Sequence, residues 1–194
     1  MKKNLIFLLI ATFFALQVQS QTSEAFSVDI PNAESIYAAQ KQTNWCWAAC
    51  NQMLLSAKGI RITQENQSVK LFGRVVNQGA GTNYELAKGA LGGTYTKSSG
   101  SSVRIVPYVS YLSQRNANDP LVIINHLNAG IPLVMATSQH GRVCVGVDYL
   151  KNGNYYQITK LRLLDPFVSS SIIEYSMQQF LQEGLMGFMT YDVR

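Results

Sequence analysis

Histidine and cysteine are scarce in this chain, and their scarcity narrows the chemistry that it can perform. Its 194 residues include two histidines, His126 and His140, and three cysteines. The cysteines form no Cys-x-x-Cys pair and no cluster with histidine, so no zinc or other metal site is expected. Nothing in the sequence points to a cofactor, and any reaction that needs an imidazole must use one of these two side chains.

Charge is also sparse. Charged residues make up 14% of the chain and apolar residues 47%, which is typical of a globular domain rather than a disordered segment. The formal net charge is +5, but without Lys2 and Lys3 of the N-terminal segment 14 basic residues stand against 11 acidic ones. No cluster of lysine or arginine follows a helix face or a loop. We therefore expect neither nucleic acid nor an anionic membrane as a partner.

Long apolar runs are absent except near the N-terminus. Two lysines are followed there by an apolar stretch from Leu5 to Leu16, and Val18 and Ser20 place small residues before a cleavage point. This order is typical of a secretory signal peptide, and the apolar run is short for a bilayer span. We expect residues 1–20 to be removed, which predicts a secreted or periplasmic protein with no membrane attachment after cleavage.

The rest of the chain is predicted to be one α+β domain. Residues 21–37 read as a short polar lead-in, and residues 38–194 form the domain, without an internal repeat or a linker. Helical periodicity dominates from 44 to 129, and strand periodicity dominates from 131 to 191. Helices followed by strands are typical of an α+β fold with an antiparallel sheet. We expect this domain to be a monomer.

Local signals mark the ends of the expected elements. Thr63 can cap a helix, Thr82-Asn83-Tyr84-Glu85 is a capping box, and Asp119-Pro120 opens a further helix. Asn152-Gly153 indicates a hairpin turn, whereas the stretch from Pro107 to Gln114 is ambiguous. The expected helices are 44–58, 63–73, 82–92, 119–129 and 177–183, and the expected strands are 131–137, 143–149, 155–164, 172–175 and 188–191.

One stretch carries the strongest chemical signal. The sequence Gln40-Lys41-Gln42-Thr43-Asn44-Trp45-Cys46-Trp47-Ala48-Ala49-Cys50 places a cysteine between two tryptophans at the start of an expected helix. The thiolate is the reactive form of cysteine, and the N–H groups and dipole at a helix N-terminus favour it. We therefore predict that Cys46 is a catalytic nucleophile. Trp45 and Trp47 are expected both to pack the helix and to wall the substrate cleft.

A cysteine nucleophile also needs a histidine and a group that orients the histidine. His126 falls inside an expected helix, whereas His140 lies at a break between two strands, from which it can reach across a cleft. His140 is therefore the favoured general base. Asp165 ends an apolar strand and is favoured as the orienting group over Asp148, which lies too far along the strand that follows His140.

The oxyanion formed during attack on a carbonyl needs hydrogen-bond donors. Gln40 precedes Cys46 by six residues, and its side-chain amide is the favoured donor beside the backbone N–H of Cys46. Gln42, at four residues, is the alternative.

The other two cysteines, Cys50 and Cys144, have two interpretations. We favour a pair of buried free thiols. The alternative is a disulfide between them, which is the one bridge available if Cys46 must remain a free thiol.

Together these residues resemble the papain-like cysteine proteases of clan CA, and most closely the compact bacterial secreted and effector type with a Gln-x5-Cys-Trp motif. The resemblance runs from about residue 38 to the end of the chain. It implies a papain-like fold in which an N-terminal helix carries the cysteine against a C-terminal antiparallel sheet. Cys46 matches the nucleophile, His140 the base, Asp165 the orienting residue and Gln40 the oxyanion glutamine.

The chain departs from the family pattern in two ways. Of the Cys-Gly-Ser/Ala-Cys-Trp signature it keeps only Cys46-Trp47, and its histidine and aspartate follow the cysteine more closely than in the larger enzymes. The resemblance implies a secreted cysteine peptidase that acts on a protein or peptide substrate. The alternatives are a cell-wall amidase or peptidase, a deamidase or an acyl transferase with the same triad, or a non-catalytic binding protein on this scaffold.

Overall fold

The structure is a computed structural model that describes residues 23–80, 84–111 and 119–194. The expected signal peptide, residues 1–20, lies outside these ranges, as do Thr82 and Asn83 of the expected capping box. Within them, no helix is both long enough and apolar enough to cross a membrane.

The fold is α+β, as the sequence predicts. The described residues contain five α-helices, one short 3-10 helix (η1) and eight strands. In chain order these elements are β1 (Glu24–Asp29), η1 (Ala33–Ile36), α1 (Cys46–Ser56), α2 (Gln64–Phe72), α3 (Glu85–Leu91), β2 (Gly93–Thr96), β3 (Ser102–Tyr111), α4 (Asp119–Asn128), β4 (Leu133–Thr137), β5 (Gly141–Asn152), β6 (Tyr155–Asp165), β7 (Ser169–Ser176), α5 (Met177–Gln182) and β8 (Leu185–Val193).

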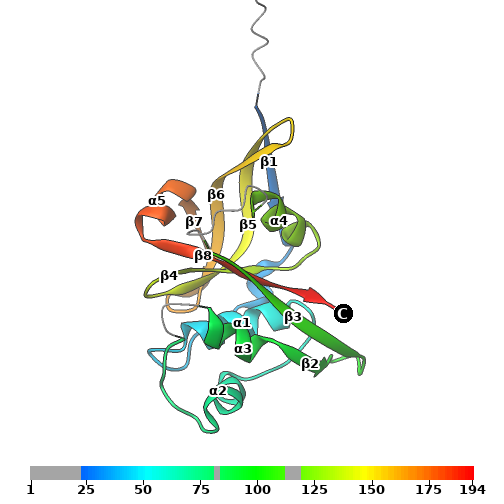
Figure 1. Ribbon diagram of the computed structural model, residues 1–194, viewed down its shortest axis with the longest axis vertical. Coiled ribbons are helices and arrows are strands. Elements are labelled where there is room, and N and C mark those ends of the chain that lie inside the picture. Colours follow the sequence, from blue (N-terminus) through cyan, green and yellow to red (C-terminus); the bar gives the residue numbers. More distant parts are fainter. Residues whose placement is uncertain (1–22, 81–83, 112–118) are drawn as a thin grey trace, which may run out of the picture.

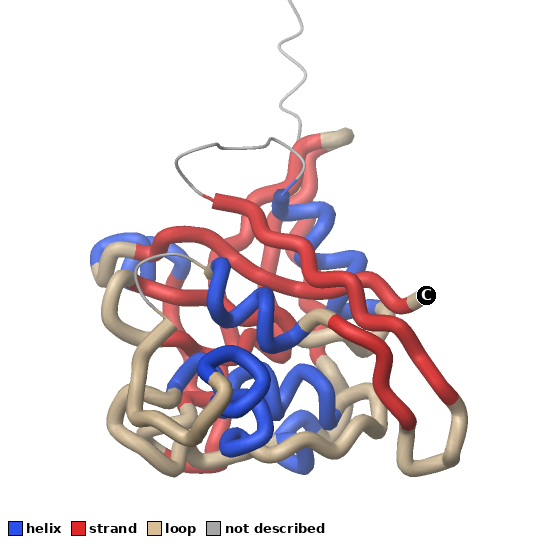
Figure 2. Tube along the Cα trace, turned by 60° about the horizontal axis from the view of Figure 1, so that its bottom comes forward, coloured by secondary structure: helices blue, strands red, loops and turns tan. Residues whose placement is uncertain are grey.

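All eight strands join one antiparallel sheet in the order β2-β3-β8-β4-β5-β6-β7, and β1 pairs with β5 beside this path. Figures 1 and 2 show α1, α2 and α3 grouped at one end of the molecule, away from α4 and α5. Side chains of β5 contribute to two apolar clusters, and a register shift against β6 between Cys144 and Gly146 interrupts their alternation. Val143 and Val145 join the cluster around α1, whereas Cys144 and Val147 join the cluster that contains α4 and α5.

Helix α1 is the buried central helix that its composition predicts. Eight of its eleven residues are buried, so it is apolar around most of its circumference. Two polar groups of α1 bond to distant elements. The Leu54 carbonyl accepts from the Tyr191 hydroxyl of β8 at 2.9 Å, and the Asn51 side-chain amide donates to the Ala87 carbonyl of α3 at 2.8 Å. These bonds tie the middle and the C-terminal half of α1 to α3 and to the sheet.

The segment predicted as a lead-in takes part in the sheet. Strand β1 pairs with β5 over its full length, from Glu24 opposite Lys151 to Asp29 opposite Gly146. Arg162 of β6 reaches across β5 to bind Asp29 and donates to the Ser27 hydroxyl at 2.7 Å. The folded unit thus begins before residue 38.

The expected order of helices first and strands second holds only in part, because β1, β2 and β3 precede α4. Strand β3 includes part of the ambiguous stretch that begins at Pro107. Proline is tolerated there because β2 pairs with β3 only up to Ile105, so beyond it one side of β3 faces no described strand. The other side pairs with β8, where Pro107 lies opposite Tyr191.

Candidate active site

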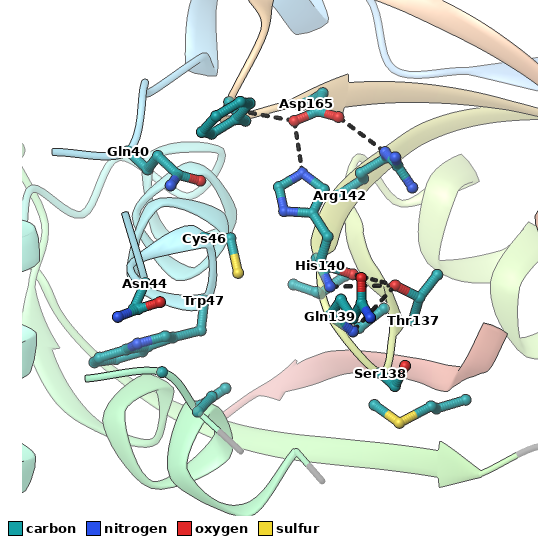
Figure 3. Close-up of a pocket in the computed structure, with 18 of the residues that line it drawn as sticks. Gln40, Asn44, Cys46, Trp47, Thr137, Ser138, Gln139, His140, Arg142 and Asp165 are labelled. Atoms are coloured by element: carbon teal, nitrogen blue, oxygen red, sulfur yellow. Dashed lines mark hydrogen bonds and ion pairs between the residues drawn. The ribbon is translucent and has the colours of Figure 1, made fainter. Parts of the chain in front are cut away.

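A pocket of about 680 Å³ opens where the start of α1 meets the β4–β5 and β6–β7 turns. The four residues predicted to take part in catalysis line it: Gln40, Cys46, His140 and Asp165. Figure 3 shows the Cys46 sulfur and the His140 ring facing each other across the pocket, with Asp165 on the far side of the ring. Residues separated by more than a hundred positions in the chain thus meet at one place.

Cys46 is the first residue of α1 and is half-buried. Burial alone raises the pKa of a thiol. Here a hydrogen bond with His140 and the backbone N–H groups of Gly141 and Trp47 outweigh burial and lower the pKa of Cys46 below its ordinary value. The site therefore favours the thiolate, which is the nucleophilic form.

His140 lies in the tight turn between β4 and β5. Its backbone N–H donates to the Thr137 hydroxyl at 3.2 Å, and its carbonyl accepts from the Thr137 N–H at 2.9 Å. The Nε2–H of the ring donates to Oδ1 of Asp165 at 2.7 Å, which leaves Nδ1 for Cys46. Burial disfavours the imidazolium, but the hydrogen bonds with Asp165 and Cys46 prevail and raise the pKa of His140 to about 9.

Asp165 ends β6, and its side chain is only 5% exposed. Burial opposes its ionisation. Hydrogen bonds from His140, from the Phe167 N–H at 2.9 Å and from Arg142 Nε at 2.9 Å nevertheless lower its pKa to about 2. The carboxylate is thus ionised at neutral pH and is held by three donors.

Arg142 is the site residue that the sequence reasoning missed. It lies on β5, two residues after His140, where its only visible signal was its place among the polar positions of an alternating strand. Its side chain is 13% exposed, and its Nη1 donates to Glu183 at 2.8 Å. The guanidinium carbon lies 5.3 Å from the ring centre of Tyr175 and 5.6 Å from that of Phe180.

Gln40 lies in the pocket, but its amide is engaged. Its Nε2 donates to the carbonyls of Gln42 and Thr43, each at 3.0 Å, while its Oε1 is buried and has no hydrogen-bond partner in the described part of the chain. In this arrangement the side chain of Gln40 stabilises the turn that leads into α1. The expected oxyanion donor is next to the nucleophile, but both of its N–H groups are in use.

The two tryptophans differ in their placement. Trp47 lines the pocket, and its indole N–H donates to the Gln78 carbonyl at 2.9 Å. Trp45 is fully buried in the core, where its indole N–H donates to the Val76 carbonyl at 2.8 Å, and it does not line the pocket. The expectation that both rings wall the cleft is therefore corrected for Trp45: it precedes the first residue of α1, and side chains two residues apart at a helix start point in different directions.

The rejected candidates lie elsewhere. The Nδ1–H of His126 donates within α4 to the Val122 carbonyl at 2.8 Å. Asp148 accepts from Arg162 at 2.7 Å on the β5–β6 pair. Neither residue lines the pocket of Cys46.

The disulfide between Cys50 and Cys144 is not formed, and all three cysteines are free thiols. The reason is geometric. Cys50 packs in the cluster around α1, whereas Cys144 points to the opposite face of β5, where its Sγ lies 3.3 Å from the Gly146 carbonyl. Among the described residues, no group of histidine, cysteine or acidic side chains is placed to hold a metal ion.

Comparison with known proteins identifies the family to which the chain belongs. No curated protein matches the chain. Among solved structures, the chain is similar to the peptidase domain of Streptococcus ComA, a bifunctional ABC transporter involved in a quorum-sensing pathway, with 14% identity and a TM-score of 0.46 over 80% of this chain and 95% of that one. The Peptidase_C39 like family matches residues 33–183. Since this range spans most of the sequence, the chain belongs to the Peptidase_C39 like family, and its predicted kinship with the papain-like cysteine peptidases is confirmed at the family level.

Proposed function

We propose that this protein is a secreted cysteine peptidase that hydrolyses peptide bonds through Cys46, His140 and Asp165. One observation carries the proposal. A thiol at a helix N-terminus, an imidazole that faces it, and a buried carboxylate hydrogen-bonded to the imidazole lie together at the wall of one pocket. This is the arrangement that activated cysteine nucleophiles require.

The acylation step follows from the charges. The Cys46 thiolate attacks the substrate carbonyl carbon, and the carbonyl oxygen becomes an oxyanion. His140, protonated at neutral pH because its pKa is raised to about 9, donates its Nδ1 proton to the leaving amine. The C–N bond breaks, which leaves a thioester on Cys46 and a neutral imidazole.

Deacylation reverses the role of the histidine. Neutral His140 takes a proton from water, and the resulting hydroxide attacks the thioester carbonyl. The carboxylic acid product leaves, and Cys46 returns as a thiolate beside an imidazolium. Asp165 stays deprotonated throughout the cycle, and its hydrogen bond holds the His140 ring so that Nδ1 faces the Cys46 sulfur.

Two donors are proposed for the oxyanion. One is the backbone N–H of Cys46, at the first turn of α1, where amides lack partners inside the helix. The other is Gln40, which becomes available once its Nε2 leaves the carbonyls of Gln42 and Thr43. This change needs only rotation within one side chain that already lines the pocket.

The pocket favours an uncharged substrate segment. Its charged side chains are His140, Asp165 and Arg142, and each of these is bonded to another of the three or to Glu183. Apart from the Cys46 thiolate, no other charged side chain lines the pocket in the described part of the chain. Since burying an unpaired charge is costly, neutral residues around the scissile bond fit this lining best.

Apolar side chains at the rim support the same substrate class. Phe167 and Val168 line the pocket in the β6–β7 turn and are 69% and 67% exposed. The Phe167 ring stands edge-on to His140, with 6.4 Å between ring centres. Exposed apolar side chains beside a nucleophile gain contact area when an apolar substrate residue covers them.

A digest of a peptide library tests the proposal. The purified protein and its Cys46→Ala variant are incubated with the same library, and the products are read by mass spectrometry. Cleavage by the wild type alone, at bonds flanked by neutral residues, supports a peptidase. Release of ammonia or transfer of an acyl group without chain cleavage would instead assign a deamidase or transferase, and solubilisation of cell wall an amidase. Equal products from both proteins contradict catalysis by Cys46.

Export is a separate part of the proposal, and it is carried by the N-terminal sequence alone. A lysine pair, an apolar run and small residues precede Gln21. The mass of the protein recovered from the periplasm or the medium tests it. A chain that starts at Gln21 is the expected result, and an intact Met1 in the cytoplasm contradicts it.

A further inference from the structure

The Asp165 carboxylate is shared between two cationic side chains. Its Oδ1 accepts from His140 at 2.7 Å, and its Oδ2 accepts from Arg142 Nε at 2.9 Å. His140 lies in the turn just before β5 and Arg142 is the second residue of β5, and their side chains meet at this carboxylate. Figure 3 shows them on either side of this carboxylate.

Arg142 is itself fixed. Its Nη1 donates to Glu183, which follows α5, at 2.8 Å, and its guanidinium lies against the rings of Tyr175 and Phe180. With 13% of its side chain exposed, it is held by β5, β7 and α5 together. An immobile guanidinium can fix the plane of the carboxylate that it contacts.

We propose that Arg142 is a positioning residue: it fixes the Asp165 carboxylate so that Oδ1 stays on His140, and through these two groups it sustains the thiolate of Cys46. This inference rests on the proposed function. A carboxylate held only at one oxygen can rotate about its terminal torsion, which is broad. Holding the second oxygen removes that freedom, so the imidazolium keeps its partner and the ring keeps its direction.

Other ionisable groups also face this part of the site. Tyr37, next to η1, is close enough to Asp165 for the carboxylate to contribute to its raised pKa, after burial. Cys50 of α1 is buried, which raises its pKa, and it is influenced by Asp165 and Arg142 as well as by Cys46. Both groups are neutral near pH 6, so Glu183 is the remaining charge that faces the guanidinium.

The chain provides a matched control in Arg162. Its side chain is also 13% exposed, and it also bridges two acidic residues, Asp29 and Asp148. It does not line the pocket of Cys46. The variants Arg142→Met and Arg162→Met therefore each remove a buried guanidinium with two acidic partners, and only the first removes it from the site.

The experiment measures the rate at which iodoacetamide alkylates Cys46 as a function of pH, read by intact mass, in the wild type and both variants. The Cys46→Ala variant gives the background. In Arg142→Met the alkylation rate at about pH 6 is expected to fall about tenfold. The midpoint of the acid limb of the pH–rate curve is expected to rise by about one pH unit, because one pKa unit is a tenfold change in the thiolate population. Arg142→Lys, which restores the charge, is expected to recover the rate to within about threefold.

A purely structural role gives a different pattern. With a purely structural role, the two Met variants lose similar thermal stability and both keep the wild-type midpoint of the pH–rate curve. This result overturns the proposal. If Arg142→Met does not fold, Glu183→Gln decides, because it removes one anchor of the guanidinium. A fall of about twofold at about pH 6 supports the inference, and an unchanged rate refutes it.

The alkylation rates of the wild type and of Arg142→Met separate the proposed function from the role of Arg142. A wild-type Cys46 that reacts no faster than a free peptide thiol contradicts the proposed function itself. A fast wild type together with an equally fast Arg142→Met variant leaves the proposed function standing and removes only the role of Arg142.

Discussion

The Nε2 atom of His140 lies 2.7 Å from Oδ1 of Asp165, and this bond determines which nitrogen of the ring faces Cys46. With Nε2 engaged, Nδ1 is the ring nitrogen that is left to face the thiol. The side chain of His140 is 22% exposed and that of Asp165 is 5% exposed, so the bond is largely shielded from water. The orientation of the His140 ring is therefore fixed by the fold itself.

The pH dependence of activity is the first prediction. Activity is expected to rise as Cys46 ionises, at a pH below the ordinary thiol pKa of about 8.5. It is expected to fall as His140 loses its proton, with a pKa of about 9. The two limbs belong to the coupled pair rather than to single residues. The measurement is kcat/KM against pH on one peptide substrate, and an acid limb at or above the ordinary thiol pKa contradicts the activated pair.

Replacement of the orienting carboxylate is the second prediction. Asp165→Asn removes the charge that helps raise the pKa of His140, so the alkaline limb is expected to move to lower pH, and kcat/KM to fall by roughly 10³-fold. Asp148→Asn is the matched control, because Asp148 is bonded to Arg162 away from the pocket. It is expected to keep activity within about twofold. Equal losses in the two variants would show that the effect comes from stability alone.

The same residue makes acid stability testable. The folded-state pKa of Asp165 is about 2, below its unfolded value of about 3.9. Its contribution to the free energy of unfolding is therefore present above about pH 4 and is lost as the pH falls towards about 2. Denaturant unfolding between these values is expected to show a steeper loss of stability in the wild type than in Asp165→Asn. Parallel curves would show that the carboxylate is not stabilised in the fold.

Local chemistry made part of this architecture predictable from the sequence. The Thr63 hydroxyl accepts from the Asn66 N–H at 3.1 Å, and Gly73 ends α2 with a φ of 71°, as the capping signals indicate. The buried stripe of α1 and the place of His140 between β4 and β5 depend on periodicity over a few residues. Such signals depend only on neighbouring residues, so they survive in the fold.

Long-range pairing explains what the sequence did not predict. The segment of β1 is polar in sequence, and only its pairing with β5 makes it part of the sheet. Arg142 meets Asp165 of β6 because the strand register places Val143 opposite Leu164. The burial of Trp45 likewise depends on the 76–78 loop, which accepts its indole N–H. No local pattern records these contacts, because each joins segments more than twenty residues apart.

The role of Gln40 gives the third prediction. An oxyanion donor acts in acyl transfer but not in alkylation by iodoacetamide, which forms no oxyanion. Gln40→Ala is therefore expected to lower kcat by about 10²-fold and to leave the alkylation rate of Cys46 unchanged. Gln42→Ala is the control and is expected to be nearly wild type. If Gln40 only holds the turn before α1, turnover and alkylation will fall together.

The free thiols give the fourth prediction. Cys50 and Cys144 lie on opposite sides of β5 and cannot be bridged without moving the backbone. Protein isolated without reductant is expected to have the mass of the fully reduced chain, and a thiol reagent in denaturant is expected to find all three cysteines. A mass lower by about two protons, with one reactive thiol, contradicts this arrangement.

The most direct test of the central claim is the rate at which Cys46 of the native protein is alkylated near pH 6, compared with a cysteine in a short peptide. A single adduct, located on Cys46, is expected to form at least about tenfold faster than the peptide adduct, because the lowered pKa of Cys46 raises its thiolate population. A rate equal to that of the peptide, or an adduct that His140→Ala leaves equally fast, would contradict the proposal that His140 activates Cys46.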